Sequence, residues 1–358
     1  MNFNFPLAGA VRMLLFPVSL IYYAVIWIRN RLYDKNFFKS TSFNLPIICV
    51  GNVAIGGTGK SPMVEYLVRM LRNEYATATL SRGYKRKTKG YALAHENSNA
   101  LEIGDEPMQF HIKFPDIAVS VGEQRLVAIP QLLHDKPGTK VIILDDAFQH
   151  RAIIAGLNIL LVDCSNLFTR DWYLPTGDLR DEKKSYKRAQ IIVITKCKAD
   201  LSEEERQDVI EEISPLSNQQ IFFTKISYGT PYHIVTNKNF LLTEEVEVLL
   251  VTGIADPRPF KKLLQEKVGA YYQLSFNDHH IFTIDDLKDI IKRFREITAS
   301  NKIVITTEKD AVRLSKFENE LKELPFYVMP IKQEFLFNDG TRFDNLIKGF
   351  IDNFKQST

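Results

Sequence analysis

Short apolar runs rich in Val, Ile and Leu recur along the chain and predict the strands of a buried sheet. Near-continuous apolar strands are typical of a parallel sheet with helices on both faces, because a strand with one solvated face alternates apolar and polar residues. The pattern therefore predicts an α/β fold with a doubly wound, mostly parallel sheet. The runs lie at 45–51, 77–81, 117–122, 140–146, 157–163 and 190–196.

The pattern changes after about residue 225. The residues from 227 to about 246 are typical of a hairpin, and four further apolar runs then alternate with helical segments such as 284–297. We therefore predict a second, smaller α/β domain. The expected division is an N-terminal helix at 1–35, a first α/β domain at 36–228, and a smaller domain at 229–358 that starts with a hairpin-like linker and includes the C-terminal helix.

Residues 13–28 form an uncharged apolar segment between Arg12 and the pair Arg29 and Arg31. The segment is slightly shorter than the roughly 20 residues that cross a bilayer, so it is expected either to span a membrane or to lie in its interface. A secretory leader is disfavoured because the residues that follow are bulky and basic. A buried core helix is the remaining alternative. The basic residues behind the segment predict that the rest of the chain lies on the cytoplasmic side.

Composition excludes some classes of protein. The chain has 358 residues, 45% of them hydrophobic, so it can bury real cores, and its formal net charge of +3 is too small to indicate nucleic-acid binding. Cys49, Cys164 and Cys197 match neither a zinc spacing nor a disulfide framework. They are interpreted as buried, reduced thiols of a cytosolic protein, with a reactive thiol as the less favoured alternative.

The segment 51–62, GNVAIGGTGKSP, follows a predicted strand and precedes an amphipathic helix. That context gives meaning to a Walker A motif, in which backbone N–H groups and the helix N-terminus surround phosphate oxygens. The first position of the strict motif is Ala54 instead of Gly. A glycine-rich turn that binds nothing is the alternative. The predicted nucleotide-binding residues are Gly56, Gly57, Thr58, Gly59, Lys60 and Ser61, with Lys60 reaching the β and γ phosphates.

A second acidic motif follows the apolar run at 140–144, where Asp145 and Asp146 end the predicted strand. Carboxylates at a strand end beside a phosphate loop hold Mg²⁺, and Ser61 would add a hydroxyl ligand. A solvated pair of acids is the alternative. ATP is favoured over GTP because the segment 194–200, ITKCKAD, does not supply the Asn-Lys-x-Asp pattern of guanine recognition.

Seven clusters occur in a fixed order: GGTGKSP (56–62), SRGY (81–84), GDEP (104–107), DDAFQH (145–150), LPTGDLR (174–180), FNDHH (276–280) and TEKDAVRL (307–314). In this order and over nearly the whole chain, the sequence resembles the tetraacyldisaccharide 4'-kinase family, the lipid A 4'-kinases of Gram-negative bacteria. The resemblance implies transfer of the γ-phosphate of ATP to the 4'-hydroxyl of tetraacyldisaccharide 1-phosphate. It also implies a location at the cytoplasmic face of the bacterial inner membrane.

The resemblance further assigns roles to single residues. Asp105 would be the general base, His279 its partner, and Arg125 would neutralise charge on the transferred phosphate. His280 competes with His279, and either ring is alternatively a surface or core histidine. The secondary candidates are Glu106, Gln149, His150, Arg180 and Asp181, of which Arg180 and Asp181 are expected to line the cleft, although the family often has Glu at the position of Asp181.

Two other functions compete with the lipid kinase. One is a membrane-tethered nucleotide switch without a lipid acceptor, and the other is a soluble small-molecule kinase whose N-terminal helix is buried. The basic run at 84–90 is expected to meet anionic headgroups or the 1-phosphate of the lipid, or else to be a solvated surface.

Overall fold

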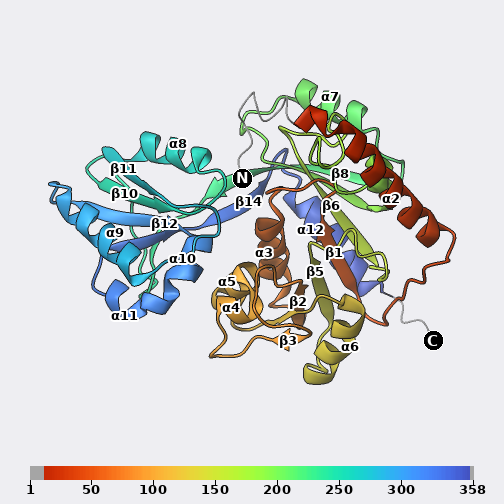
Figure 1. Cartoon of the computed structure of the whole chain (residues 1–358), viewed down its shortest axis with the longest axis horizontal. Helices are drawn as coiled ribbons and strands as arrows, with labels where there is room; N and C mark the ends of the chain where they lie inside the picture. The colour runs from red at the N-terminus through yellow and green to blue at the C-terminus, as the bar shows by residue number, and fades with distance from the viewer. Residues whose placement is uncertain (1–11, 355–358) are drawn as a thin grey trace. The chain divides into compact units, whose positions relative to one another are not determined.

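The computed structural model describes residues 12–354, and these divide into two compact units. The larger unit contains residues 12–227 and 333–354, and the smaller unit contains residues 228–332. The first eleven residues of the predicted segment 1–35 and the last four residues of the chain lie outside the described residues. Figure 1 shows the elements of both units.

Within residues 12–354, the larger sheet has nine strands in the order β14-β8-β7-β6-β1-β5-β2-β4-β3. From β4 to β8 all neighbours are parallel, and the short β3 pairs antiparallel with β4. Six of the strands fall within the apolar runs that predicted them. The strands are β1 (Ile47–Gly51), β2 (Thr77–Ser81), β3 (Ala92–Leu93), β4 (Ala118–Val121), β5 (Val141–Asp145), β6 (Leu157–Asp163), β7 (Ile191–Thr195), β8 (Gln220–Tyr228) and β14 (Ile331–Phe335).

Helices cover both faces of this sheet, as its apolar strands require. One core contains side chains of α3, α5 and α12, and the other contains side chains of α6 and α7. The mixed α/β class with a large, mostly parallel sheet is therefore confirmed. The helical elements of the larger unit are α2 (Phe16–Asp34), α3 (Lys60–Leu71), α4 (Ala100–Ile103), α5 (Asp105–Lys113), α6 (Arg125–Asp135), η1 (Lys183–Arg188), α7 (Glu203–Ile213) and α12 (Gly340–Asp352).

The C-terminal helix α12 groups with the larger unit, although the sequence-based division assigns it to the second domain. Its residues Phe343, Ile347 and Ile351 are buried in the same core as Met63 and Leu67 of α3. The strand β14 returns the chain to the nine-stranded sheet before α12 begins, where it lies beside β8. The helix therefore completes one face of the larger sheet (Figure 1).

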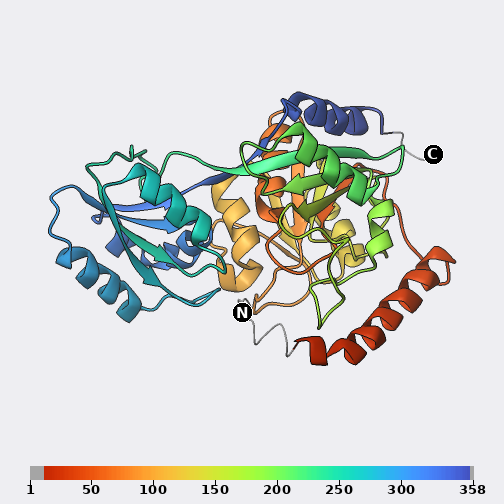
Figure 2. The ribbon, with the colours of Figure 1, turned by 90° about the horizontal axis from the view of Figure 1, so that it is seen from above.

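The N-terminal helix α2 has its polar side toward the protein. Its buried residues are Ser19, Ile26 and Asn30, and the hydroxyl of Ser19 donates to that of Thr176 at 2.7 Å. Figure 2 shows α2 as the red helix at the edge of its unit. The buried-core alternative is wrong, because most apolar side chains of the segment are exposed: Met13, Leu14, Leu15, Val18, Leu20, Ile21, Val25, Trp27 and Ile28. None of the helices within residues 12–354 has both the length and the apolar character for crossing a bilayer.

The smaller unit contains a sheet of five strands among its described residues, in the order β11-β10-β12-β13-β9, of which only β9 is antiparallel. The segment expected as a hairpin is a turn closed by a bridge between Tyr232 and Asn239, and β9 pairs with β13. The elements are β9 (Tyr232–His233), β10 (Glu247–Thr252), α8 (Arg258–Lys267), β11 (Ala270–Ser275), α9 (Ile284–Glu296), β12 (Lys302–Thr307), α10 (Glu308–Leu314), η2 (Ser315–Phe317), α11 (Glu318–Leu321) and β13 (Phe326–Met329).

All three cysteines carry free thiols, but they differ in burial. Cys49 and Cys197 are buried as predicted, whereas Cys164 is only half-buried, so the prediction is wrong for that residue. Cys164 follows β6 and Cys197 follows the neighbouring β7. The neighbouring thiol of Cys197 lowers the pKa of Cys164 to about 7. Two cysteines far apart in sequence are thus neighbours because parallel strands bring their ends together.

Candidate functional site: a phosphate loop with strand-end carboxylates

The predicted phosphate loop connects β1 to α3 in the larger unit. Gly59 precedes the helix with φ of +82°, and Gly56 has φ of +104°. Both values lie in the region that a side chain with a Cβ rarely adopts, so these two positions require glycine. Lys60 and Ser61 begin α3, where the free N–H groups of the first turn and the helix dipole attract anions. The local geometry is therefore that of a phosphate cradle.

Buried side chains brace the loop from the sheet. Asn52 is fully buried and its amide donates to the hydroxyl of Thr58 at 2.9 Å. Thr195, at the end of β7, donates through its hydroxyl to the carbonyl of Thr58 at 2.9 Å. Sequence reasoning missed Asn52, although a polar residue directly after the buried strand β1 was a signal for a side chain that acts inside the loop.

Asp145 and Asp146 lie beside this loop, because β5 is the parallel neighbour of β1 and Val50 is in register with Asp145. Asp145 is 3% exposed and accepts from the hydroxyl of Ser81 at 3.3 Å. The ammonium nitrogen of Lys60 lies 3.8 Å from a carboxylate oxygen of Asp146. The guanidinium of Arg180 also pairs with Asp146. The structure thus brings together Lys60, both acids and Arg180.

Glu106 joins the same cluster from α5. Its carboxylate accepts from the hydroxyl of Ser61 at 3.0 Å. Asp105 is the first residue of α5 and is half-buried, directly after Gly104, whose φ is +95°. A Cβ at Gly104 would lie 3.1 Å from the carbonyl oxygen of Tyr84 in the SRGY segment. The sharp turn at this glycine places both acids of GDEP at the start of one helix.

Burial and neighbouring charges shift the pKa values of the two strand-end acids in opposite directions. Burial, followed by the charges of Glu106 and Asp146, raises the pKa of Asp145 to about 7. Burial opposes ionisation at Asp146 too, yet the hydrogen bond from Arg180 and the charge of Lys60 hold the pKa of Asp146 below its usual value. Burial lowers the pKa of Lys60, which the charge of Asp146 partly offsets. The positive charges of Lys60 and Arg125 therefore do not fully compensate the burial of Asp145 and the negative charges beside it.

Arg125 lies within this charge cluster but is only 3% exposed. Its guanidinium donates to the carbonyls of Gly122 at 3.0 Å, Glu123 at 3.4 Å and Asp145 at 3.3 Å. Its positive charge thus faces the end of β5 from the protein interior. Direct contact of Arg125 with a phosphate group stays a prediction.

Gln149 and His150 follow the acids on the same turn. The amide of Gln149 donates to the carbonyl of Asn52 at 2.7 Å, and Arg29 of α2 donates to the carbonyl of Gln149 at 2.6 Å. Burial, followed by the charge of Arg125, lowers the pKa of His150 to about 4, so its ring is neutral at physiological pH. Gln149 therefore connects the phosphate loop to the N-terminal helix.

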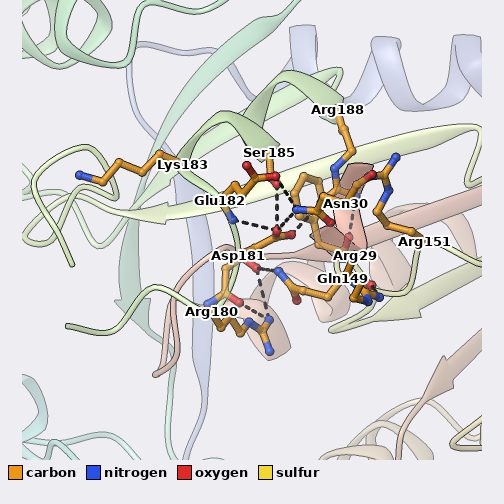
Figure 3. A network of polar contacts seen from close by, with 12 residues as sticks. Arg29, Asn30, Gln149, Arg151, Arg180, Asp181, Glu182, Lys183, Ser185 and Arg188 are labelled. Carbon is orange, nitrogen blue, oxygen red and sulfur yellow. Dashed lines mark hydrogen bonds and ion pairs between the residues drawn. The ribbon is translucent and has the colours of Figure 1, made fainter. Parts of the chain in front are cut away.

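Asp181 does not line a cleft, which corrects the sequence-based expectation. It is 1% exposed, and its carboxylate accepts from Asn30 at 2.9 Å, Ser185 at 2.9 Å and Arg188 at 2.8 Å. Figure 3 shows this network, in which Asn30 of α2 meets both Asp181 and Glu182. The carboxylate of Asp181 thus makes hydrogen bonds that fix its own loop to α2. The side chain of the neighbouring Arg180 points to Asp146.

The smaller unit holds the two candidate histidines in different surroundings. The ring of His279 lies 3.0 Å from the guanidinium of Arg313, whereas Nε2 of His280 lies 2.9 Å from Asp286, which caps α9. The ring of His280 also stacks on Phe276 at 4.6 Å. His280 is therefore explained by local packing. Asp105 belongs to the larger unit, and the expected pair of His279 and Asp105 stays a prediction.

A pH experiment tests the burial of Asp145. Without Mg²⁺ and nucleotide, Asp145→Asn is expected to stabilise the protein relative to wild type, increasingly as pH rises from about 4 to about 7. In this window the folded wild type still holds a proton at Asp145 that the unfolded chain, with an ordinary pKa, has already lost, so unfolding releases a proton and becomes easier as pH rises. Its free energy of unfolding therefore falls by up to about 1.4 kcal/mol per pH unit relative to the variant. Urea unfolding at several pH values measures this, and a pH-independent difference would contradict it.

A glycine loop between a parallel strand and a helix, with a lysine, a serine and strand-end carboxylates around it, defines a P-loop phosphotransferase type of site. Comparison with known proteins gives the particular family. Residues 11–351 match the family model of tetraacyldisaccharide-1-P 4'-kinase, LpxK. The chain belongs to this family, and the resemblance inferred from the seven ordered clusters is confirmed.

Relatives with this name cover almost the whole chain. A tetraacyldisaccharide 4'-kinase of Flavobacterium johnsoniae is 45% identical over 95% of this chain and 97% of its own length. One from Bacteroides thetaiotaomicron is 42% identical over 94% of this chain and 92% of its own length. The crystal structure described as the "apo" form of LpxK from Aquifex aeolicus in complex with ATP matches with a TM-score of 0.74 at 29% identity. The match covers 95% of this chain and 99% of that one.

Proposed function

We propose that this chain is an ATP-dependent kinase that transfers the γ-phosphate to the 4'-hydroxyl of tetraacyldisaccharide 1-phosphate. The observation that carries the proposal is the convergence of Lys60, Ser61, Glu106 and both strand-end acids on one phosphate loop, in a chain of this family. The loop amides and Lys60 would bind the phosphates of ATP and stabilise the charge that develops on the transferred group.

Mg²⁺ fits this set of donors. The oxygen Oδ1 of Asp145 is buried without a hydrogen-bond partner, and the hydroxyl of Ser61 lies among the same carboxylates. Carboxylate and hydroxyl oxygens are the ligands that Mg²⁺ takes together with phosphates and water. Residues 12–354 contain no group of three or more His, Cys, Asp or Glu side chains that could hold a metal ion by themselves. We propose that Ser61 and Asp145, with Asp146 beside them, hold Mg²⁺, which when bound neutralises phosphate charge.

Asp105 is the proposed general base for the sugar hydroxyl, which is a poor nucleophile without proton removal. Glu106, next to it, already accepts from Ser61 and is committed to the phosphate side of the site. The proposal therefore assigns the acceptor to Asp105, the neighbouring acid at the start of the same helix. His279 is the proposed partner of Asp105, because His280 is held by Asp286.

The proposed location is the cytoplasmic face of the bacterial inner membrane, with α2 in the lipid interface. Support comes from the apolar side chains that α2 turns outward, among them Leu20 at 54% and Ile21 at 67% exposure. A row of exposed apolar residues on one helix is costly in water and typical of an interfacial helix. Arg31, at the end of the helix, is exposed and suits anionic headgroups.

The proposed reaction is tested by transfer of a radiolabelled γ-phosphate from ATP to tetraacyldisaccharide 1-phosphate in detergent micelles with Mg²⁺. Labelled lipid made by the wild type and absent with Asp105→Ala is the expected result. Hydrolysis of ATP without labelled lipid would overturn the proposal and favour the nucleotide switch.

The membrane contact is tested by vesicle binding. The double variant Ile21→Glu with Val25→Glu is expected to lower the partition coefficient onto vesicles of phosphatidylethanolamine and phosphatidylglycerol about tenfold or more, because both side chains would enter the interface. They are 67% and 60% exposed, so the fold does not need them. Leu241→Glu, at 76% exposure in the smaller unit, is the matched control. Equal binding of both variants in co-sedimentation would contradict the interfacial role of α2.

A further inference from the structure

His279 is held in an unusual backbone conformation in the smaller unit. Its φ is +63°, in the left-handed region that residues with a Cβ rarely adopt. The backbone N–H of His279 donates to the carbonyl of Gly253 at 3.2 Å, just beyond β10. Such a conformation persists only where the surrounding structure fixes it, and it concentrates at functional sites. The ring of His279 therefore starts from a fixed backbone.

A buried ion pair of α10 fixes the same turn. Asp310 is 0% exposed, and its carboxylate accepts from the backbone N–H of Gly253 at 3.0 Å and from Arg313 at 3.0 Å. Arg313 is 7% exposed and also donates to the carbonyl of Gly253 at 3.2 Å. Both residues belong to the TEKDAVRL segment, to which the proposed reaction assigns no role. The pair therefore holds both the N–H and the carbonyl of Gly253, and this carbonyl also accepts the hydrogen bond from the backbone N–H of His279.

The other terminal nitrogen of this guanidinium is directed at the histidine ring. Nη2 of Arg313 lies 3.0 Å from Nδ1 of His279. A guanidinium can only donate hydrogen bonds, so Nδ1 must accept. A neutral ring that accepts at Nδ1 carries its proton on Nε2. The contact with Arg313 thus selects one of the two tautomers and sets the plane of the ring.

We propose that Arg313 is a positioning residue that fixes the ring of His279 with its proton on Nε2, so that this nitrogen donates to a carboxylate. This inference rests on the proposed function, in which that carboxylate is the general base Asp105. Asp310 holds Arg313 in turn, as a carboxylate commonly orients the group behind a functional histidine. The TEKDAVRL segment therefore orients the histidine without touching the substrate.

The test compares full-length Arg313→Met with wild type in the lipid kinase assay and in ¹H–¹⁵N correlation spectra of protein with ¹⁵N-labelled histidine rings. His279→Gln identifies the signals of His279. Arg293→Met is the matched control, since Arg293 makes an exposed pair with Asp289 on α9. If Arg313→Met fails to fold because the charge of Asp310 is left without its partner, the double variant Asp310→Asn with Arg313→Met replaces it. Removing both charges leaves no buried charge without compensation.

We expect kcat to fall about tenfold or more with the KM for ATP unchanged, since the phosphate loop is intact, and the ring of His279 to lose its single Nε2–H tautomer. The control should change neither quantity. Wild-type kcat, or reduced kcat with an unchanged tautomer, would overturn the inference. Wild-type kcat in His279→Gln would instead show that the proposed pair of His279 and Asp105 is wrong, so the two failures are distinguishable.

Discussion

Replacing Lys60 with alanine is expected to reduce kcat/KM for phosphoryl transfer about a thousandfold or more, which corresponds to about 4 kcal/mol of lost transition-state stabilisation. The ammonium group lies 3.8 Å from Asp146, inside the ring of carboxylates. It is the only cation at the first turn of α3 among the described residues. Without it, the negative charge of the phosphates would face Asp145, Asp146 and Glu106 with less compensation.

The fold should tolerate this change, because Lys60 contributes little to either hydrophobic core. The measurement is steady-state kinetics of label transfer, with a thermal melt for each protein. Lys288→Ala is the control: that lysine is 70% exposed on α9 and pairs with Asp285 nearby. Near-normal turnover of Lys60→Ala beside a normal control would rule out a P-loop mechanism for this chain.

Replacing Asp105 with asparagine is expected to lower kcat by about a hundredfold to ten-thousandfold, while the affinity for ATP stays close to that of wild type. Asparagine keeps the size and position of the side chain but cannot take the proton of the acceptor hydroxyl. The phosphate loop, including the contact of Ser61 with Glu106, is unaffected by this change. Loss of turnover without loss of nucleotide binding is the signature of a missing base.

Two measurements check this prediction: the rate of label transfer to the lipid, and equilibrium binding of a non-hydrolysable ATP analogue. Asp116→Asn is a matched control, because Asp116 is a surface acid whose partner is Arg72. A variant Asp105→Asn that transfers phosphate at the wild-type rate would exclude Asp105 as the base. Glu106 would then be the next candidate, since it begins the same helix.

The local pattern of the sequence was sufficient for the elements and for the phosphate loop. Strands β1, β2, β4, β5, β6 and β7 lie in the predicted apolar runs, because burial on both faces makes a parallel strand apolar throughout. The strand β8 was missed, since its outer half is only partly buried and its sequence lacks a continuous apolar run. The residues Gly56 to Ser61 were found because all of their chemistry lies in one short segment.

The candidate histidines show where the sequence alone stops. His279 and His280 are adjacent in the sequence, and the sequence pattern does not distinguish between them. The turn after β11 directs one ring to Arg313 and the other to Asp286, which removes the ambiguity. The pattern of apolar and polar residues does not predict the contact between Arg313 and His279, because the two residues are 34 positions apart in the sequence.

The sequence by itself determined the fold class, the strand positions, the phosphate loop and the family, because each depends on burial periodicity or on contiguous and ordered motifs. The tertiary structure alone decided that Glu106 meets Ser61, that Asp181 is buried against Asn30, that α12 belongs to the larger unit, and that α2 turns its apolar side outward. The physical reason is common to all four. Each depends on a contact between segments that are distant in the chain, and such contacts form only when the sheet brings those segments together.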